Sequence, residues 1–211
     1  MEKEANSLYR ALIQGEIRPL LRKNNFRSRG SVFRRRRDGV WHLITLQKSR
    51  SSTACRKIFT VNLGVASERI LLWEEVEPAR CGVPDCHWRE RLGHLSAEKR
   101  DVWWTLEDEE SATSAGMQVK QWLEDYGLPE LDKLADDAAL RDLWLAERSP
   151  GLTDTERLLN LSILLRDLGP QDKYEATIKA LKELAASKSA PMLTVYLREI
   201  GEYPTPESTK I

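Results

Sequence analysis

The sequence lacks most of the features that place a protein in a class at first sight. No apolar run approaches the roughly 20 residues that a membrane-spanning helix needs, and Met1–Ala5 shows neither the apolar core nor the cleavage site of a signal peptide. Only three cysteines are present, so any disulfide framework would leave one thiol over. We therefore expect a cytoplasmic protein with reduced thiols and no membrane partner.

Motifs for catalysis and cofactor binding are missing as well. The chain contains no Walker A, GxGxxG, HExxH or GxSxG pattern. Cys81, Cys86, His87 and His94 have the spacing C-x4-C-H-x6-H, which lacks the CxxC pair typical of zinc sites. Two small loop cysteines and two ordinary histidines explain this pattern more simply. We predict no metal site and no cofactor.

Cys55 is the one candidate nucleophile. Arg56 and Lys57 follow it directly, and neighbouring cations favour the thiolate. Nucleophilic catalysis would also need a base, and nothing in the sequence places a histidine beside this thiol. We predict no catalytic residue and lean toward a protein that is not an enzyme.

What is present is a globular composition with an uneven charge. The 211 residues are 41% hydrophobic and 31% charged, which is typical of a folded chain rather than a disordered one. The net charge is zero, yet residues 1–60 carry 15 Lys and Arg against 4 Asp and Glu. Such asymmetry can mark a surface that binds polyanions. The alternative is that the basic half packs against the acidic half of the same fold.

A hairpin lies at the centre of the pattern. Val40–Lys48 is apolar on both faces, as in a strand covered on both sides. Ile58–Val65 alternates apolar and polar residues, as in a half-buried strand. Ser31–Arg37 is a third strand, and its arginines on both faces favour an edge position. Two shorter strands are expected at residues 86–92 and 101–106.

Helices account for the rest of the chain. Residues 4–24 carry an apolar stripe at helical spacing, with Pro19 expected to kink or split the helix. Helices return after residue 111, and Gly127 and Pro129 predict the end of the first of them. Thr153 and Glu156 form a capping box at the start of another.

These elements predict an α+β fold with one antiparallel sheet of about four to five strands, an N-terminal helix packed on it, and C-terminal helices. The predicted domains are an α+β domain at residues 1–148 and a helical appendage at residues 149–203. Residues 204–211 are expected to form a flexible tail.

The ordered set of motifs in residues 8–146 resembles the domain-of-unknown-function 4304 family of bacterial proteins. The resemblance implies an α+β fold with an antiparallel sheet and no known activity, catalytic residue or cofactor. The segments that carry it are Leu20–Leu21, Asn25–Phe26, Phe33 with Arg35, Trp41, Leu46–Ser49, Phe59–Gly64, His87–Arg89, Arg91–Gly93 and Trp103–Trp104.

The run of four arginines at Arg34–Arg37, with the basic residues near it, is the strongest functional candidate. Phosphate recognition needs clustered cations, and the planar guanidinium matches a phosphate. We predict a non-enzymatic module whose basic face binds nucleic acid or an acidic protein partner. The alternatives are arginines paired with Glu107–Glu110, and an immunity-type adaptor that acts through the leucine-rich C-terminal helices. The predicted anion-binding residues are Arg34, Arg35, Arg36, Arg37, Arg50, Arg56 and Lys57.

Overall fold

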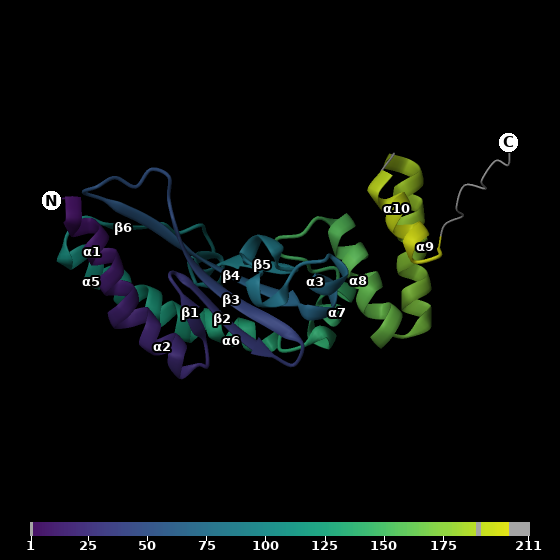
Figure 1. Cartoon of the computed structure of the whole chain (residues 1–211), viewed down its shortest axis with the longest axis horizontal. Coiled ribbons are helices and arrows are strands. Elements are labelled where there is room, and N and C mark those ends of the chain that lie inside the picture. The colour runs from purple at the N-terminus through teal and green to yellow at the C-terminus, as the bar shows by residue number, and fades with distance from the viewer. Residues whose placement is uncertain (1, 189–190, 203–211) are drawn as a thin grey trace. The chain divides into compact units, whose positions relative to one another are not determined.

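The computed structural model describes residues 2–188 and 191–202 (Figure 1). The chain divides into two compact units, with the division between Leu140 and Arg141. The predicted tail at residues 204–211 lies outside the described residues. The assignment of residues 1–148 and 149–203 to separate domains stays a prediction.

The first unit is built on an antiparallel sheet, which confirms the predicted α+β class. Its strand order is β1-β2-β3-β4-β5, and β6 pairs with β4 beyond the end of β5 (Figure 1). The register places β5 on residues 62–65 of β4 and β6 on residues 57–59, so these two short strands follow one another along the same edge. The strands are β1 Arg27–Arg29, β2 Val32–Arg37, β3 Val40–Lys48, β4 Lys57–Ser67, β5 Trp88–Arg91 and β6 Trp104–Leu106.

The central hairpin is confirmed as two long strands. β3 has the predicted bounds, and β4 extends one residue further at its start and two at its end. Asp38 and Gly39 join β2 to β3 with φ values of 43° and 84°, which is the left-handed backbone of a tight two-residue hairpin turn. The turn chemistry therefore sets the register in which Arg35 lies opposite His42.

The predicted edge position of the arginine strand is wrong for half of its length. β1 pairs with residues 32–34 of β2, so only residues 35–37 lack a neighbour on that side among the described strands. β1 was missed because its three residues, all exposed, show no apolar alternation. A three-residue polar edge strand is a common way for proteins to blunt an exposed sheet edge.

Two long helical segments each contain a proline, and each accommodates it with a π-helical turn. α1 (Glu2–Leu12) continues through the π-helical turn η1 (Ile13–Ile17) into α2 (Arg18–Lys23). Pro19 lacks an N–H and clashes with the carbonyl of an α-helix four residues earlier, and the wider π turn removes both conflicts. The predicted change at Pro19 is therefore a π bulge and not a break.

The predicted helix end at Gly127 and Pro129 is wrong for the same reason. α5 (Glu109–Trp122) passes through the π turn η4 (Leu123–Gly127) into α6 (Leu128–Lys133), and Pro129 lies in the first turn after the bulge. The remaining helices of this unit are α3 Glu68–Trp73, η2 Pro78–Arg80, η3 Val83–Asp85, α4 Leu92–Leu95 and the start of α7 Asp137–Leu145.

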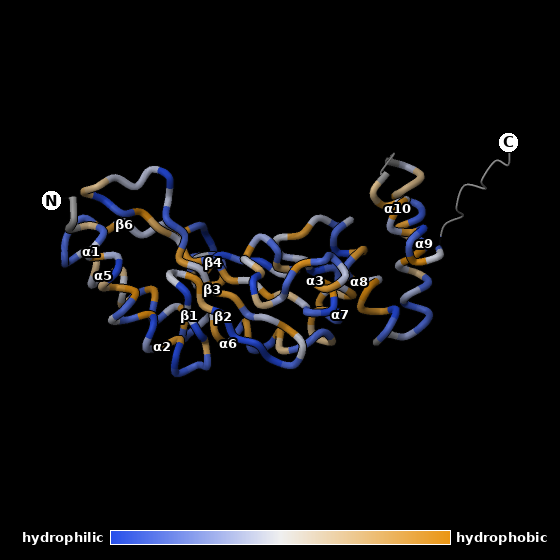
Figure 2. Tube along the Cα trace, in the orientation of Figure 1, coloured by the Kyte–Doolittle hydropathy of each residue, from blue (hydrophilic) through white to orange (hydrophobic). Residues whose placement is uncertain are grey.

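The sheet is covered on both faces, which explains why β3 is apolar on both sides. α1, α2, α5 and α6 run along one face (Figure 1), and hydrophobic segments line the interior between them and the strands (Figure 2). On the other face, Leu43 and Ala66 pack with Leu71 of α3 and with Cys81 and Cys86. Burial of both faces supplies most of the driving force for this unit.

Gly64 of β4 is required by a close approach of two chain segments. A Cβ atom at this position would lie 2.5 Å from Sγ of Cys86 and 2.9 Å from its Cβ. We expect Gly64→Ala to lower the free energy of unfolding by about 2 kcal/mol, because overpacked cores must shift backbone or rotamers. Urea denaturation measures this change.

Gly15 provides the control for that substitution. A Cβ atom at Gly15 meets nothing within 4 Å, so Gly15→Ala should leave the stability unchanged or raise it by up to about 1 kcal/mol. Adding Cys86→Ala to Gly64→Ala should restore part of the loss. Equal stability of the Gly64 and Gly15 variants would contradict the packing argument.

The second unit contains three further helices. The predicted capping box is confirmed: Oγ1 of Thr153 accepts from the amide of Glu156, and the Glu156 carboxylate accepts from the amide of Thr153. No helix in the described part of the chain combines the length and the apolar character needed to cross a membrane. The helices are α8 Asp154–Leu168, α9 Gln171–Lys188 and α10 Pro191–Glu199.

Candidate anion-binding site

The arginine run of β2 divides between the two faces of the sheet. Side chains alternate along a strand, so Arg35 and Arg37 point to the helix-covered face and Arg34 and Arg36 to the other. The four cations that adjoin in sequence therefore do not form one surface.

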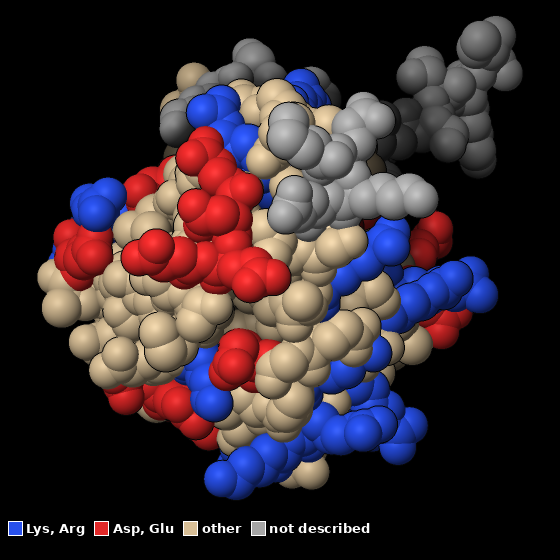
Figure 3. All heavy atoms as spheres, turned by 90° about the vertical axis from the view of Figure 1, so that its left-hand side faces the viewer, with Lys and Arg blue, Asp and Glu red and all other residues tan. Residues whose placement is uncertain are grey.

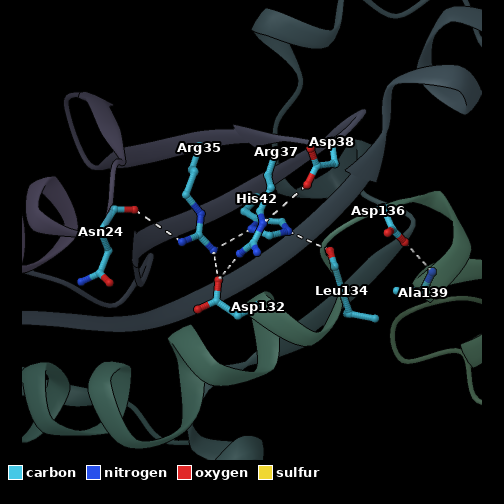
Figure 4. Close-up of polar contacts among 9 residues, drawn as sticks. All are labelled: Asn24, Arg35, Arg37, Asp38, His42, Asp132, Leu134, Asp136 and Ala139. Carbon is cyan, nitrogen blue, oxygen red and sulfur yellow. Dashed lines mark hydrogen bonds and ion pairs between the residues drawn. The ribbon is translucent and has the colours of Figure 1, made fainter.

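On the helix-covered face, the arginines bind an acidic residue of α6. Nη2 of Arg35 donates to Oδ1 of Asp132 at 2.6 Å, and Nη1 of Arg37 donates to the same oxygen at 3.1 Å (Figure 4). The Arg35 side chain is only 10% exposed and lies over the ring of Phe26. These two arginines therefore fasten α6 to the sheet.

His42 completes this group. Its Nδ1 accepts from Nη2 of Arg35 at 2.8 Å, and its Nε2 donates to the carbonyl of Leu134 at 2.8 Å (Figure 4). Because a guanidinium can only donate, this pair of bonds defines the neutral tautomer with its proton on Nε2. Burial lowers the pKa of His42 to about 4, and the nearby Arg35 and Arg37 charges act in the same direction.

On the other face, the arginines fasten α3 and the segment after it. Nε and Nη2 of Arg34 both donate to the carbonyl of Cys81. Arg36 makes a bidentate pair with Glu68 of α3 at 2.6 and 2.7 Å, and this pair holds the pKa of the Glu68 carboxyl below its usual range. The indole N–H of Trp41 donates to the same carboxylate. All four arginines of β2 are thus bonded within the protein.

The three other predicted residues, in the β3–β4 loop and at the start of β4, have different environments. Arg50 is exposed, Arg56 lies 4.0 Å from Glu107, and the buried Lys57 donates to the carbonyl of Thr53. Among the ion pairs of the described residues, the Arg56–Glu107 contact is the one that matches the predicted pairing with Glu107–Glu110. The structure leaves the anion-binding role of all seven residues as a prediction.

The cysteines and histidines considered for chemistry lie in separate environments. Cys81 and Cys86 are buried, and burial raises the pKa of the Cys81 thiol to about 11. His87 accepts from the amide of Ser67 and contacts Glu74. Within residues 2–188 and 191–202, no three His, Cys, Asp or Glu side chains are grouped to hold a metal.

Cys55 and His94 are likewise separated. Cys55 is exposed in the β3–β4 loop, whereas the imidazole of His94 bonds to Glu90 of β5. The third histidine, His42, has both ring nitrogens bonded. The structure thus brings no histidine of the described residues to Cys55 by a hydrogen bond.

Sequence reasoning missed a different basic surface, which runs along α1, η1 and α2. Two depressions of about 600 and 630 Å³ lie between these helices and the β1–β2 hairpin, and a third of about 450 Å³ lies on η1 and α2. Arg18 lines all three. We call them the basic groove. Its charged and polar lining residues, none of them acidic, are Asn6, Arg10, Gln14, Arg18, Arg22, Lys23, Asn25, Arg27, Ser28, Ser31 and Lys48.

The helical part of the groove has a regular pattern. Asn6, Arg10, Gln14, Arg18 and Arg22 recur every four residues, so each lies beside the next along the helix surface. Arg10 and Arg22 are therefore about 18 Å apart along the helix axis. This spacing was the signal that the sequence offered for the groove, and the apolar stripe of the same helix concealed it.

The cations of the groove have no partner of their own. The side chains of Arg10, Arg18, Arg22, Lys23 and Arg27 make no hydrogen bond or ion pair with any described residue, and that of Lys48 lies over the ring of Tyr9. Figure 3 shows a band of Lys and Arg on one side of this end of the molecule and a patch of Asp and Glu on the other. The positive charge is therefore concentrated on one side of this surface.

Comparison with known proteins gives one match. The family model described as a domain of unknown function (DUF4304) matches residues 17–133, which include α2, the whole sheet and α5 to α6. No curated protein matches the chain, and no solved structure does.

Proposed function

The chain belongs to the DUF4304 family, and from this premise we propose that it is a non-enzymatic binding module that holds a polyanion, most simply nucleic acid, in the basic groove. The observation that supports the proposal is the contrast between two sets of arginines. Those of β2 are bonded within the protein, whereas those of α2 have no partner among the described residues. Unpaired cations concentrated along one helix face provide the main term of nucleic-acid affinity.

The groove favours contact with phosphates over reading of bases. Base stacking uses exposed aromatic rings, but Tyr9, Phe26 and Phe33, the aromatic residues that line the groove, are all buried. The polar lining consists of long cations and short hydroxyl or amide groups. We therefore expect binding that depends on salt and varies little with sequence.

The test is fluorescence anisotropy with a labelled oligonucleotide, measured from 50 to 200 mM salt. Neutralising Arg10, Arg18 and Arg22 together with glutamine should weaken binding at low salt at least tenfold. The slope of log K against log salt should become shallower by about 2 to 3, since each lost phosphate contact removes about 0.7 to 0.9.

A triple variant of equal charge serves as the control. Arg148, Lys173 and Lys179 are exposed residues of the second unit that do not line the groove, and their replacement by glutamine removes the same three charges. This variant should bind like the unmodified protein. Equal losses in both variants would mean that only net charge matters, and no binding at 50 mM salt would end the nucleic-acid proposal.

The other function inferred from the sequence, an adaptor that acts through the C-terminal helices, stays a prediction. On α10, Met192 is 79% exposed and Val195 is 45% exposed. Two exposed apolar side chains are common on protein surfaces and do not indicate a partner. The basic groove is therefore the better supported candidate.

A further inference from the structure

The largest of the three depressions that form the basic groove combines several donors without acceptors. The depression of about 630 Å³ is lined by Arg18, Arg22, Asn25 and Ser28 among its polar residues. This volume falls in the range of small-molecule sites. None of these four side chains makes a hydrogen bond or an ion pair with a described residue. Together they present guanidinium, amide and hydroxyl donors to one space.

Arg18 is the centre of this arrangement. It is half-buried, and its Nε lies out of contact with solvent and has no hydrogen-bond partner among the described residues. A buried donor without an acceptor is costly. A small movement of the guanidinium toward an anion would give this donor the acceptor that the protein does not supply.

The carbonyl groups at the end of α2 are hydrogen-bonded within the protein. The carboxyl end of a helix normally repels anions, because its last carbonyls are unpaired. Here the carbonyls of Leu20, Leu21 and Arg22 accept bonds from the amides of Asn24, Asn25 and Phe26, and the side-chain amide of Asn24 adds another bond to Leu20. These three carbonyls are therefore paired and do not present unbonded oxygens to an anion.

The backbone at Asn25 positions the wall of the depression. Asn25 has a φ of 65°, a left-handed conformation that asparagine tolerates better than most residues. The chain reverses there into β1, where Ser28 pairs with Phe33 and so faces the helix-covered side of the sheet. Asn25 and Ser28 thus line the same depression as Arg18 and Arg22.

We propose that Arg18, Arg22, Asn25 and Ser28 form a seat for a single phosphate group. The seat rests on the proposed function in that its phosphate would belong to the bound polyanion, either as a terminal monoester or as an internal diester. Arginine suits this role because its planar fork donates two bonds to one phosphate. The remaining cations of the groove would bind the rest of the polyanion through charge alone.

The first test observes the seat directly in the full-length protein. Inorganic phosphate is titrated while ¹H–¹⁵N NMR records the Arg18 side-chain Nε–H and the amides of residues 25–28. These signals should shift with saturation, and chloride at the same ionic strength should not move them. If phosphate and chloride have equal effects, the seat is not specific and the proposal is overturned.

The second test separates geometry from charge. Arg18→Lys keeps the charge but removes the fork, and should weaken oligonucleotide binding about tenfold, the usual value of one charged hydrogen bond. The matched control is Arg148→Lys, which makes the same change at an exposed arginine outside the groove and should bind like the unmodified protein. If the two variants bind equally well, the seat is overturned.

Two oligonucleotides identify the source of the phosphate. One carries a 5′ phosphate and the other is identical without it. Tighter binding of the phosphorylated form that is lost in Arg18→Lys supports a terminal monoester, and equal binding of both forms that falls in Arg18→Lys supports an internal diester. If Arg18→Lys binds like the unmodified protein but the triple glutamine variant does not, the seat fails and the proposed function stands. If phosphate shifts the Arg18 signals but no oligonucleotide binds, the seat stands and the proposed function fails.

Discussion

Replacing Asp132 with alanine should lower the free energy of unfolding by about 2 kcal/mol, because it leaves the buried guanidinium of Arg35 without its counter-charge. Asp132 is 47% exposed, but Arg35, which it neutralises, is only 10% exposed. The loss therefore comes mainly from the desolvated guanidinium of Arg35. Chemical denaturation at neutral pH measures it.

A control on the same helix distinguishes this loss from a change in α6 itself. Glu130 of α6 pairs with the exposed Lys133, and surface pairs of this kind contribute about 0.5 kcal/mol or less. Glu130→Ala should therefore change stability little. A cost similar to that of Asp132→Ala would show that helix propensity or net charge is responsible.

A double-mutant cycle tests whether Arg35 is the partner that matters. Arg35→Met and Asp132→Ala should together cost less than the sum of the two single changes, by about 1–3 kcal/mol, as expected for groups in direct contact. The remaining cost of the double variant reflects His42, whose Nδ1 loses its donor. Strict additivity would mean that Arg35 and Asp132 do not stabilise each other.

This network shows where prediction from the sequence succeeds and where it stops. The alternation of β2 correctly separates Arg35 and Arg37 from Arg34 and Arg36, because the two-residue period of a strand is local. The identity of their partners is not local. Asp132 lies almost a hundred residues further along the chain, and nothing in its own segment distinguishes it from Glu130.

The helices show the same limit. Pro19 and Pro129 are correctly identified as irregular positions, since proline disturbs any α-helix. Whether the helix ends or inserts a π turn depends on packing against the sheet, which the local sequence does not reveal. The basic groove was missed for a related reason: its cations come from α1, α2, the β1–β2 hairpin and the end of β3, and only the fold places them together.

Acidification from about pH 6.5 to pH 4 should lower the stability of the protein, because His42 is buried in its neutral form. The folded protein holds this imidazole neutral with a pKa of about 4, whereas the unfolded chain binds a proton below its ordinary pKa near 6.5. The unfolded state therefore takes up more protons as the pH falls through this window. Unfolding free energy should decrease by up to about 1.4 kcal/mol per pH unit, and by about 3 kcal/mol in total.

The hydrogen bonds and neighbouring charges of His42 explain why its imidazole stays neutral in the folded state. Nδ1 faces the guanidinium of Arg35 and Nε2 already carries its proton toward Leu134, so a second proton would enter beside a cation. Arg37 adds to this repulsion, and Asp132 opposes it in part. Protonation would also remove the acceptor that Arg35 uses.

His42→Gln should remove this pH dependence while keeping a side chain that can accept from Arg35 and donate to Leu134. Unfolding by urea at several pH values between 7 and 5 gives the curves, and the difference between the two proteins isolates His42 from carboxylates that titrate lower. His94→Gln is the control, because it removes a histidine whose side chain is 44% exposed and should keep the original slope. If the unmodified protein and His42→Gln give parallel curves, the neutral buried imidazole does not limit stability in acid.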